Sequence, residues 1–362
     1  MISGSLTGVG RDAAPRVGIV MPTYLRPDLL RLALASVQAQ TFTSFLVYVC
    51  DNGDDPETRR VVDELADHRF LYVARPHNLG MLGNVLQGFR EAGTELILEL
   101  DDDDRLLPDA LEHLVAPFDE FEDLVLSFGD LCIVDETGAA VPPEVASETV
   151  SSARSLTPGI QPRFREIAAR GFIETPAVLV RRDVLVAMDF PAEAGTAYDL
   201  HLCIQAARAG GDAYYVGRPV VRYCVHDGAD SELNYPDQLA AAEFVLLMAR
   251  SGAIGEEKHV LAEELANIRV EQIRTALRRR EWRMAAGHAR QAFSDSPGAR
   301  VTMSWYARVR IRPHLRPSRH RRRNSTEWDP GRASEAALGS VEAPAPPPRR
   351  GREGGHAGVA AP

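Results

Sequence analysis

A run of four aspartates, Asp101 to Asp104, directly follows the apolar stretch 95–100. Carboxylates packed together repel one another and raise each other's pKa values, and a divalent cation relieves that repulsion. Carboxylate oxygens suit Mg²⁺ or Mn²⁺, whose remaining ligands are water and substrate phosphates. The run therefore predicts a metal site that handles phosphate. The alternative is a solvated acidic turn whose aspartates cap the helix that begins at Pro108.

Polar loops follow three other apolar stretches. They are Met21-Pro-Thr-Tyr-Leu-Arg26, Asp51-Asn-Gly53, and Asn78-Leu-Gly80, which leads into Asn84. Each loop alone is a common turn or helix cap. Because they occur in order, each behind a predicted strand, they favour a single ligand site at one edge of a sheet.

Alternating strand and helix patterns must position these loops. Strand-type runs lie at 17–21, 45–50, 70–73, 95–100 and 124–128, and helical spacing lies at 28–40, 57–66, 84–92 and 108–115. Near-continuous apolar strands between helices predict an α/β fold, with a parallel sheet covered by helices on both faces. Beyond it the sequence predicts a hairpin over 130–141, strands over 172–181, 213–216 and 220–225, a helix over 199–209, and only helices over 236–293.

The composition excludes several classes of protein. Lys258, between Glu257 and His259, is the only lysine in 362 residues, which argues against a P-loop NTPase or a pyridoxal enzyme. No apolar run is long enough to predict a transmembrane helix, and the first ten residues do not resemble a signal peptide. Four widely separated cysteines suit a reducing compartment, so a cytoplasmic location is expected.

Charge divides unevenly along the chain. Residues 300–362 hold 13 arginines against five acidic residues, which gives this segment a net charge of +8. The whole chain has a net charge of −10, so residues 1–299 carry −18. An acidic body argues against a nucleic-acid partner. Arginines alternate with apolar residues after Val301, so the segment 301–323 is expected to touch an anionic membrane or, equally well, to dock on the protein.

At this point the sequence resembles the family-2 glycosyltransferases, inverting enzymes of the GT-A fold that use a nucleotide-sugar donor. The resemblance covers about residues 16–228. The matching motifs are Met21–Arg26, Cys50–Gly53, Asn78–Gly80, Leu100–Asp104 with Pro108, Ala197-Tyr-Asp-Leu200, and Tyr223-Cys-Val-His226.

The resemblance assigns a role to each motif. The donor-binding set it implies is Pro22, Thr23, Tyr24, Arg26, Asp51, Asn78, Gly80, Asn84, Asp101 and Asp102. The Pro22–Tyr24 loop would line the base, which Asp51 would bind, and the 78–84 region would border the ribose and diphosphate. Asp101 and Asp103 would form the DxD motif that holds Mn²⁺ or Mg²⁺. Asp103 would be the direct ligand, and His226 would contact the metal or the diphosphate.

Two carboxylates receive catalytic roles by the same resemblance. Asp199 would be the general base, and Asp104 would face the donor sugar or the acceptor. The chain departs from the family in two places. Leu82-Gly83-Asn84 replaces the common Ala-Arg-Asn, which removes a diphosphate-binding arginine, and Tyr198 stands where many relatives carry a glutamate.

The resulting hypothesis is a metal-assisted, inverting glycosyltransferase. It would act on a UDP- or dTDP-sugar and a glycan, lipid-linked or small-molecule hydroxyl, in the cytoplasm or on the inner face of the membrane. Its expected organisation is a flexible start (1–15), a GT-A domain (16–235), a helical C-terminal subdomain (236–312) and a disordered tail (313–362). One alternative is a nucleotide-sugar-binding protein without turnover. The other is a haloacid-dehalogenase-like phosphatase, which Arg105 and the position of Lys258 disfavour.

Overall fold

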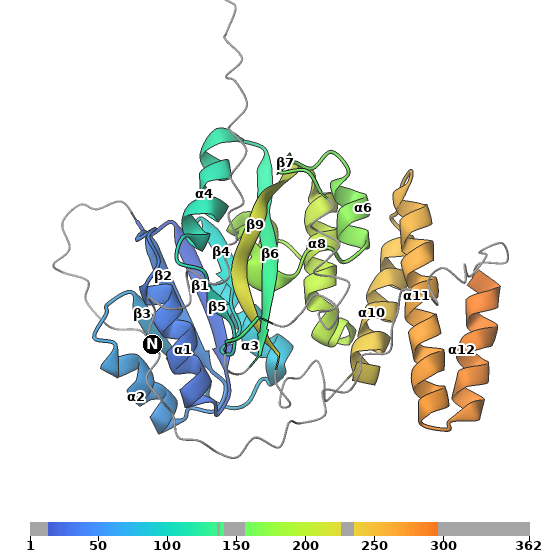
Figure 1. Cartoon of the computed structure of the whole chain (residues 1–362), viewed down its shortest axis with the longest axis horizontal. Helices are drawn as coiled ribbons and strands as arrows, with labels where there is room; N and C mark the ends of the chain where they lie inside the picture. Colours follow the sequence, from blue (N-terminus) through green and yellow to red (C-terminus); the bar gives the residue numbers. More distant parts are fainter. Residues whose placement is uncertain (1–13, 136–137, 141–155, 226–234, 296–362) are drawn as a thin grey trace, which may run out of the picture. The chain divides into compact units, whose positions relative to one another are not determined.

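The computed structural model describes residues 14–135, 138–140, 156–225 and 235–295 (Figure 1). Within them, one mixed sheet of nine strands has helices on both faces. The expectations for the ends of the chain, 1–13 and 296–362, lie outside the described residues, and the boundaries of the expected domains stay predictions.

The strands run in the order β3-β2-β1-β4-β8-β6-β9-β5, and β7 pairs with β9. Their bounds are β1 Val17–Thr23, β2 Phe45–Asp51, β3 Phe70–Ala74, β4 Leu96–Glu99, β5 Arg105–Leu106, β6 Leu124–Asp135, β7 Gly159–Ile160, β8 Val178–Arg181 and β9 Asp212–Val225. The predicted parallel arrangement holds for β1 to β4 and for β6 with β9. Strand β8, for which the sequence predicted no direction, runs antiparallel to both β4 and β6. Three apolar residues followed by an arginine carry no signal for the direction of a strand.

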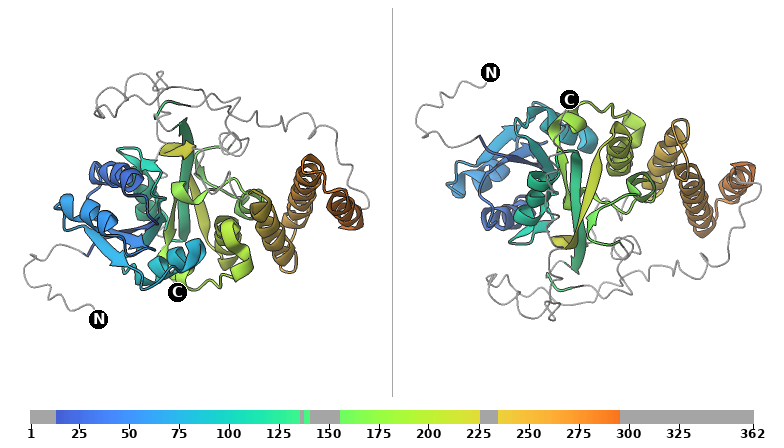
Figure 2. Two further views of the ribbon diagram at one scale, coloured as in Figure 1. Left: turned by 90° about the horizontal axis from the view of Figure 1, so that it is seen from below. Right: turned by 90° about the horizontal axis from the view of Figure 1, so that it is seen from above.

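The helices cover the two faces of the sheet in two groups (Figure 2). Their bounds are α1 Pro27–Gln38, α2 Pro56–Glu64, α3 Gly80–Glu91, α4 Ala110–Glu120, α6 Phe164–Ala169, α7 Arg182–Val186, α8 Tyr198–Ala209, α10 Tyr235–Arg250, α11 Glu257–Arg278 and α12 Trp282–Asp295. Helices α1, α2 and α4 bury apolar residues on one face, and α3, α6 and α8 do so on the other. Along β1, Ile19 and Met21 face the first group and Val20 faces the second, as the period of two in a strand requires.

Three predicted strands have different limits in the structure. Strand β6 runs unbroken through Asp130 to Asp135, so the predicted hairpin is wrong about where its first strand begins. Its turn is confirmed by the hydrogen bond from Gly138 N to Asp135 O, 2.8 Å long. The two strands predicted over 213–225 are one strand, because a bulge beside Gly217 and Pro219 lets β9 continue. Only 178–181 of the strand predicted over 172–181 is extended, because the 3₁₀ turn η1 (Thr175–Ala177) precedes it.

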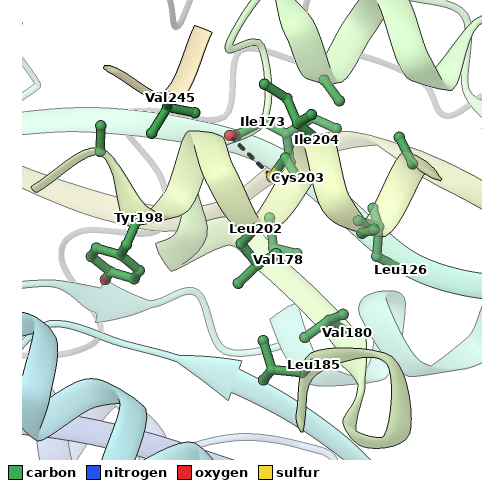
Figure 3. Close-up of a cluster of buried hydrophobic side chains, with 14 of the residues drawn as sticks. Leu126, Ile173, Val178, Val180, Leu185, Tyr198, Leu202, Cys203, Ile204 and Val245 are labelled. Carbon is green, nitrogen blue, oxygen red and sulfur yellow. Dashed lines mark hydrogen bonds between the residues drawn. The ribbon is translucent and has the colours of Figure 1, made fainter. Parts of the chain in front are cut away.

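The helical region predicted over 236–293 is confirmed as α10, α11 and α12. Val245 of α10 and Val260 of α11 are buried in the same apolar cluster as Ile204 and Cys203 of α8, part of which Figure 3 shows. The carboxylate of Glu257 accepts a 2.7 Å hydrogen bond from the Arg208 guanidinium, which ties the start of α11 to the end of α8. No helix in the described ranges is long and apolar enough to cross a membrane.

Close packing of α3 on β1 makes a specific prediction for Gly88. A methyl group added there would lie 2.5 Å from Val20 Cγ1 and 3.1 Å from Cys50 Sγ. Alanine normally stabilises a helix by about 1 kcal/mol relative to glycine. Here overpacking should dominate and lower the free energy of unfolding by about 1–3 kcal/mol in urea.

The matched control is Gly287→Ala in α12, where the added methyl group meets no atom within 4 Å. This variant should unfold at the wild-type urea concentration or above. If both variants lost the same free energy of unfolding, close packing of α3 on β1 would not be the cause of the loss.

Candidate functional site

The carboxyl ends of β1, β2 and β3 meet at one edge of the sheet, as the loop order predicted. Thr23 pairs with Asp51, and Asp51 pairs with Ala74, in consecutive parallel strands. The backbone N–H of Asn52 donates to the Thr23 carbonyl over 3.0 Å. The loops of three strands therefore form one continuous surface at this edge.

Asn52 locks two of these loops together. Its Nδ2 donates to Asn78 Oδ1 at 3.0 Å and to the Gly80 carbonyl at 3.2 Å, while its Oδ1 accepts from Leu79 N at 2.8 Å. Gly80 has a φ of +73°, a conformation that favours glycine, and its N–H also donates to Asn78 Oδ1. Asn78 and Gly80 thus shape the start of α3. The role of Asn52 was missed, although the motif contained it.

Asp51 is fully buried and binds its own loop. Its Oδ1 accepts from Gly53 N at 2.9 Å, and its Oδ2 accepts from Asp55 N and the Tyr72 hydroxyl, each at 2.7 Å. These three bonds use most of the acceptor capacity of a carboxylate. The structure therefore gives Asp51 a loop-shaping role, and the contact with a base remains a proposal.

Asn84 is also directed into the protein. Its Nδ2 donates to the Cys50 carbonyl, and its Oδ1 accepts from Arg75 Nε, both at 2.8 Å. Arg75 is buried as well, and its Nη1 donates to both carboxylate oxygens of Glu91 at 2.8 Å. Arg75 was missed because it follows β3 without a recognisable motif.

The first strand loop reaches the aspartate run directly. Thr23 Oγ1 donates to Asp102 Oδ2 at 2.7 Å, and Arg26 Nη1 lies 3.4 Å from Asp102 Oδ1 and 3.3 Å from Asp103 Oδ2. Burial raises the pKa of Asp102 to about 6, against the effect of these two donors. Arg26 thus supplies positive charge at the acidic edge.

Asp101, Asp103 and Asp104 bring carboxylate oxygens within 4.8 Å of one another. Asp104 is fully buried: its Oδ1 accepts from Cys224 N at 2.9 Å, while its Oδ2 has no hydrogen-bond partner. Burial, followed by repulsion from the neighbouring carboxylates, raises the pKa values of Asp101 and Asp104 well above their usual range. Three carboxylates with an unsatisfied buried oxygen are a donor set suited to Mg²⁺ or Mn²⁺.

The alternative of a solvated, helix-capping turn is wrong. Asp102 and Asp104 are buried, and the residue before α4 is Asp109, which makes no side-chain capping bond. Thr23 and Arg26 hold Asp102 from the end of β1, and Cys224 of β9 holds Asp104.

Glu99, the last residue of β4, was missed by the sequence analysis. It is 3% exposed, and neither carboxylate oxygen has a hydrogen-bond partner. Burial raises its pKa to about 7, and the charge of Asp199 adds to the rise. With Thr175 and Leu202 it lines a cavity with room for about one water molecule. A glutamate inside an apolar strand next to four aspartates was the available signal.

Asp199 lies in the first turn of α8, beside the acidic run. The capping position is held by Ala197 and makes no side-chain bond, so the alternative that Asp199 is an ordinary N-cap is wrong. Its Oδ1 accepts from Leu200 N at 2.6 Å. Burial raises its pKa to about 6, and its charge acts on both Glu99 and the buried Tyr198. Asp199 therefore acts electrostatically on Glu99, the carboxylate at the end of β4.

Three predicted residues remain: Pro22, Tyr24 and His226. Pro22 lies in β1 opposite Cys50, and Tyr24 is 47% exposed, with its ring against Gly53. These positions leave the Tyr24 ring open at the surface of the edge. His226 lies outside the described residues.

Most residues of this edge lie in a part of the chain that matches a known protein family. The family model described as glycosyl transferase family 2 matches residues 18–185. This part of the chain belongs to glycosyl transferase family 2. The match includes the loops after β1, β2 and β3 and the aspartate run, and it ends before α8.

Curated relatives agree with the family. A Campylobacter jejuni GalNAc(5)-diNAcBac-PP-undecaprenol beta-1,3-glucosyltransferase is 33% identical over 127 residues, which are 34% of this chain and 40% of the relative. The Escherichia coli UDP-Glc:alpha-D-GlcNAc-diphosphoundecaprenol beta-1,3-glucosyltransferase WfgD is 29% identical, over 28% of this chain and 40% of the relative. The chain therefore spans less than half the length of these relatives.

Solved structures share the fold. Residues 1–349 of S. aureus TarS in complex with UDP-GlcNAc match with a TM-score of 0.60 and 18% identity, over 77% of this chain and 81% of TarS 1–349. The mannosyltransferase PcManGT from Pyrobaculum calidifontis, in complex with GDP-Man and Mn²⁺, matches with a TM-score of 0.54 and 17% identity, over 79% and 76%. The expected GT-A fold of the family is confirmed.

The buried position of Glu99 predicts a pH-dependent effect of Glu99→Gln. Because its native pKa of about 7 lies above the ordinary 4.5, ionising this group destabilises the wild-type protein as the pH rises between these values. Glutamine does not ionise. Relative to wild type, the variant should therefore gain about 2–3 kcal/mol in free energy of unfolding from pH 5 to pH 8, measured by urea titration in EDTA.

Glu120→Gln, at an exposed position in α4, is the control and should show no such gain. A stability difference for Glu99→Gln that is the same at both pH values would contradict the raised pKa.

Proposed function

We propose that the protein is a glycosyltransferase that moves a sugar from a nucleoside-diphosphate donor to a hydroxyl group of a lipid-linked acceptor, with inversion at the anomeric carbon. The observation that carries the proposal is the gathering of Asp101, Asp103 and Asp104 at the sheet edge, with Asp199 at the start of α8 near Glu99, two residues before Asp101. The lipid-linked acceptors named for two relatives support the acceptor class. These two relatives favour a lipid-linked acceptor over a glycan or a small molecule.

The donor would bind across the loops of β1, β2 and β3. The exposed Tyr24 ring suits stacking with a base, and the names of two similar proteins, with UDP-GlcNAc and UDP-Glc, support a uridine nucleotide. Asp103, with Asp101 and Asp104, would hold Mn²⁺ or Mg²⁺. When bound, the metal would neutralise charge on the leaving nucleoside diphosphate. His226 remains a proposed additional contact to the metal or the diphosphate.

Asp199 would act as the general base. An acceptor hydroxyl is a poor nucleophile, so a carboxylate must take its proton while the oxygen attacks the anomeric carbon. A pKa of about 6 leaves Asp199 ionised at neutral pH and makes it a better proton acceptor than an ordinary aspartate. Its place in the first turn of α8 gives it a fixed position near Glu99. Work on a lipid-linked acceptor would place the protein in the cytoplasm, at the inner face of the membrane.

The metal assignment predicts that donor binding needs a divalent cation and Asp103. A donor at 100 times its dissociation constant should stabilise the wild-type protein by about 2.7 kcal/mol. With UDP and Mn²⁺, the melting temperature should rise for wild type and should not rise for Asp103→Ala or in excess EDTA.

Asp28→Ala provides the control, because Asp28 is an exposed carboxylate in the first turn of α1, outside the cluster. It should respond to UDP and Mn²⁺ as the wild-type protein does. An undiminished UDP-induced shift in EDTA would overturn the metal assignment.

The general-base assignment predicts a selective loss of turnover in Asp199→Asn. Loss of general-base help typically lowers kcat by about 10²–10⁴-fold. Donor affinity should stay near normal, because the interaction is made mainly in the transition state. The melting temperature should not fall, because removing a carboxylate charge whose pKa is raised in the native state does not destabilise that state.

Asp183→Asn is a closely matched control. Asp183 lies in the first turn of α7, and its Oδ1 accepts from the next backbone N–H, at Val184, as Asp199 does at Leu200. Its kcat should stay at the wild-type value. Near-normal turnover of Asp199→Asn would remove Asp199 from the mechanism.

A further inference from the structure

The turn between α11 and α12 forms a defined tip, residues 277–284, hereafter the arginine tip. Arg280 has a φ of +62°, and Glu281 N donates to the Ala276 carbonyl at 2.8 Å, which closes the last turn of α11. Helix α12 begins at once with Trp282. The chain therefore reverses within a few residues, and every residue from 277 to 284 except Glu281 is exposed.

Large apolar side chains are exposed at this tip. Trp282 is 66% exposed, Met284 55% and Leu277 41%. In the described part of the chain, no other large hydrophobic side chain is as exposed as Trp282. Burying these three groups elsewhere would be favourable, so this surface is suited to contact with an apolar medium or partner.

Four exposed arginines surround the apolar groups: Arg278, Arg279, Arg280 and Arg283. None of them forms an ion pair within the described ranges. With Glu281 as the only acidic residue, the tip carries a net charge of +3. The tip lies in the 299-residue portion whose net charge is −18, so its positive charge is a local exception.

We infer that the arginine tip docks on an anionic lipid surface. Arginine is attracted to negatively charged headgroups, and tryptophan is favoured where headgroups meet acyl chains. A second copy of the chain would bring the same positive charge to a tip-to-tip contact, which disfavours that occupant. The inference goes beyond the proposed sugar transfer, and it uses residues other than the segment 301–323.

The position of the tip fits such contact. Helix α10 starts at the end of the sheet where β9 finishes, and α11 runs antiparallel beside α10 (Figure 1). The end of α11, which carries the tip, therefore lies at the same end of the helical layer as the start of α10. An acceptor anchored in a membrane would be presented from the side on which the tip makes contact.

Vesicle co-sedimentation of the full chain tests this inference, with neither donor nor acceptor present. The probes are phosphatidylcholine vesicles with and without phosphatidylglycerol. The wild-type protein should bind the anionic vesicles and not the neutral ones. The double substitution Arg278→Glu with Arg279→Glu should weaken binding at least about tenfold, and Trp282→Ala about tenfold.

The controls make the same chemical changes at exposed positions away from the tip. They are Arg90→Glu with Arg163→Glu for the charges, and Ile254→Ala for the apolar group. Both should bind vesicles as the wild-type protein does. All variants change exposed side chains, so their melting temperatures should stay at the wild-type value.

Three results would overturn the inference. The first is no binding to anionic vesicles. The second is undiminished binding by the tip variants, which would assign any membrane contact to another part of the chain, such as 301–323. The third is a change in oligomeric state of the tip variants in lipid-free sedimentation, which would identify a second copy as the occupant. Because none of these measurements involves sugar transfer, they are independent of the proposed function.

Discussion

Five acidic residues converge at the end of β4, and the other parts of the candidate site are arranged around their mutual repulsion. Glu99, Asp102 and Asp104 are buried, and Asp101 and Asp103 lie within reach of Asp104. Only part of the charge is balanced from inside the protein, by Arg26 and by backbone or hydroxyl donors. A fold that keeps this many carboxylates together is held at a cost in stability, and a bound cation is the simplest way to offset it.

The sheet makes this concentration of charge possible. Strands β1 to β4 are parallel, so their carboxyl ends must meet at one edge. Most residues of β1, β2 and β4 are buried, whereas the edge strand β3 is partly exposed. Strand β9 closes the other side, where Cys224 N donates to Asp104. Helix α8 then adds Asp199 from a chain segment about 100 residues away. The site therefore forms only when the parallel strands, β9 and the start of α8 are all in place.

Much of this arrangement follows from patterns in the sequence. Apolar runs with polar loops behind them gave the first four strands, and the run of four aspartates gave the centre of the site. The direction of β8 and the continuity of β6 and β9 did not follow, because a short strand does not encode its partner and a bulge resembles a turn. Glu99, Asn52 and Arg75 were missed for a related reason. Their roles come from burial and from partners distant in the sequence, and no local spacing reports these.

The cross-links made by Asn52 have a consequence for how a ligand meets this surface. The loops behind β2 and β3 are fixed to each other by three hydrogen bonds, and a fourth fixes Asn52 to the end of β1. A ligand that settles there does not have to freeze a disordered loop, so little chain entropy is lost in association. Binding at these loops would therefore use a preorganised surface and would not require the loops to order around the ligand. The selectivity of the proposed donor site would then depend mainly on the shape of these hydrogen-bonded loops.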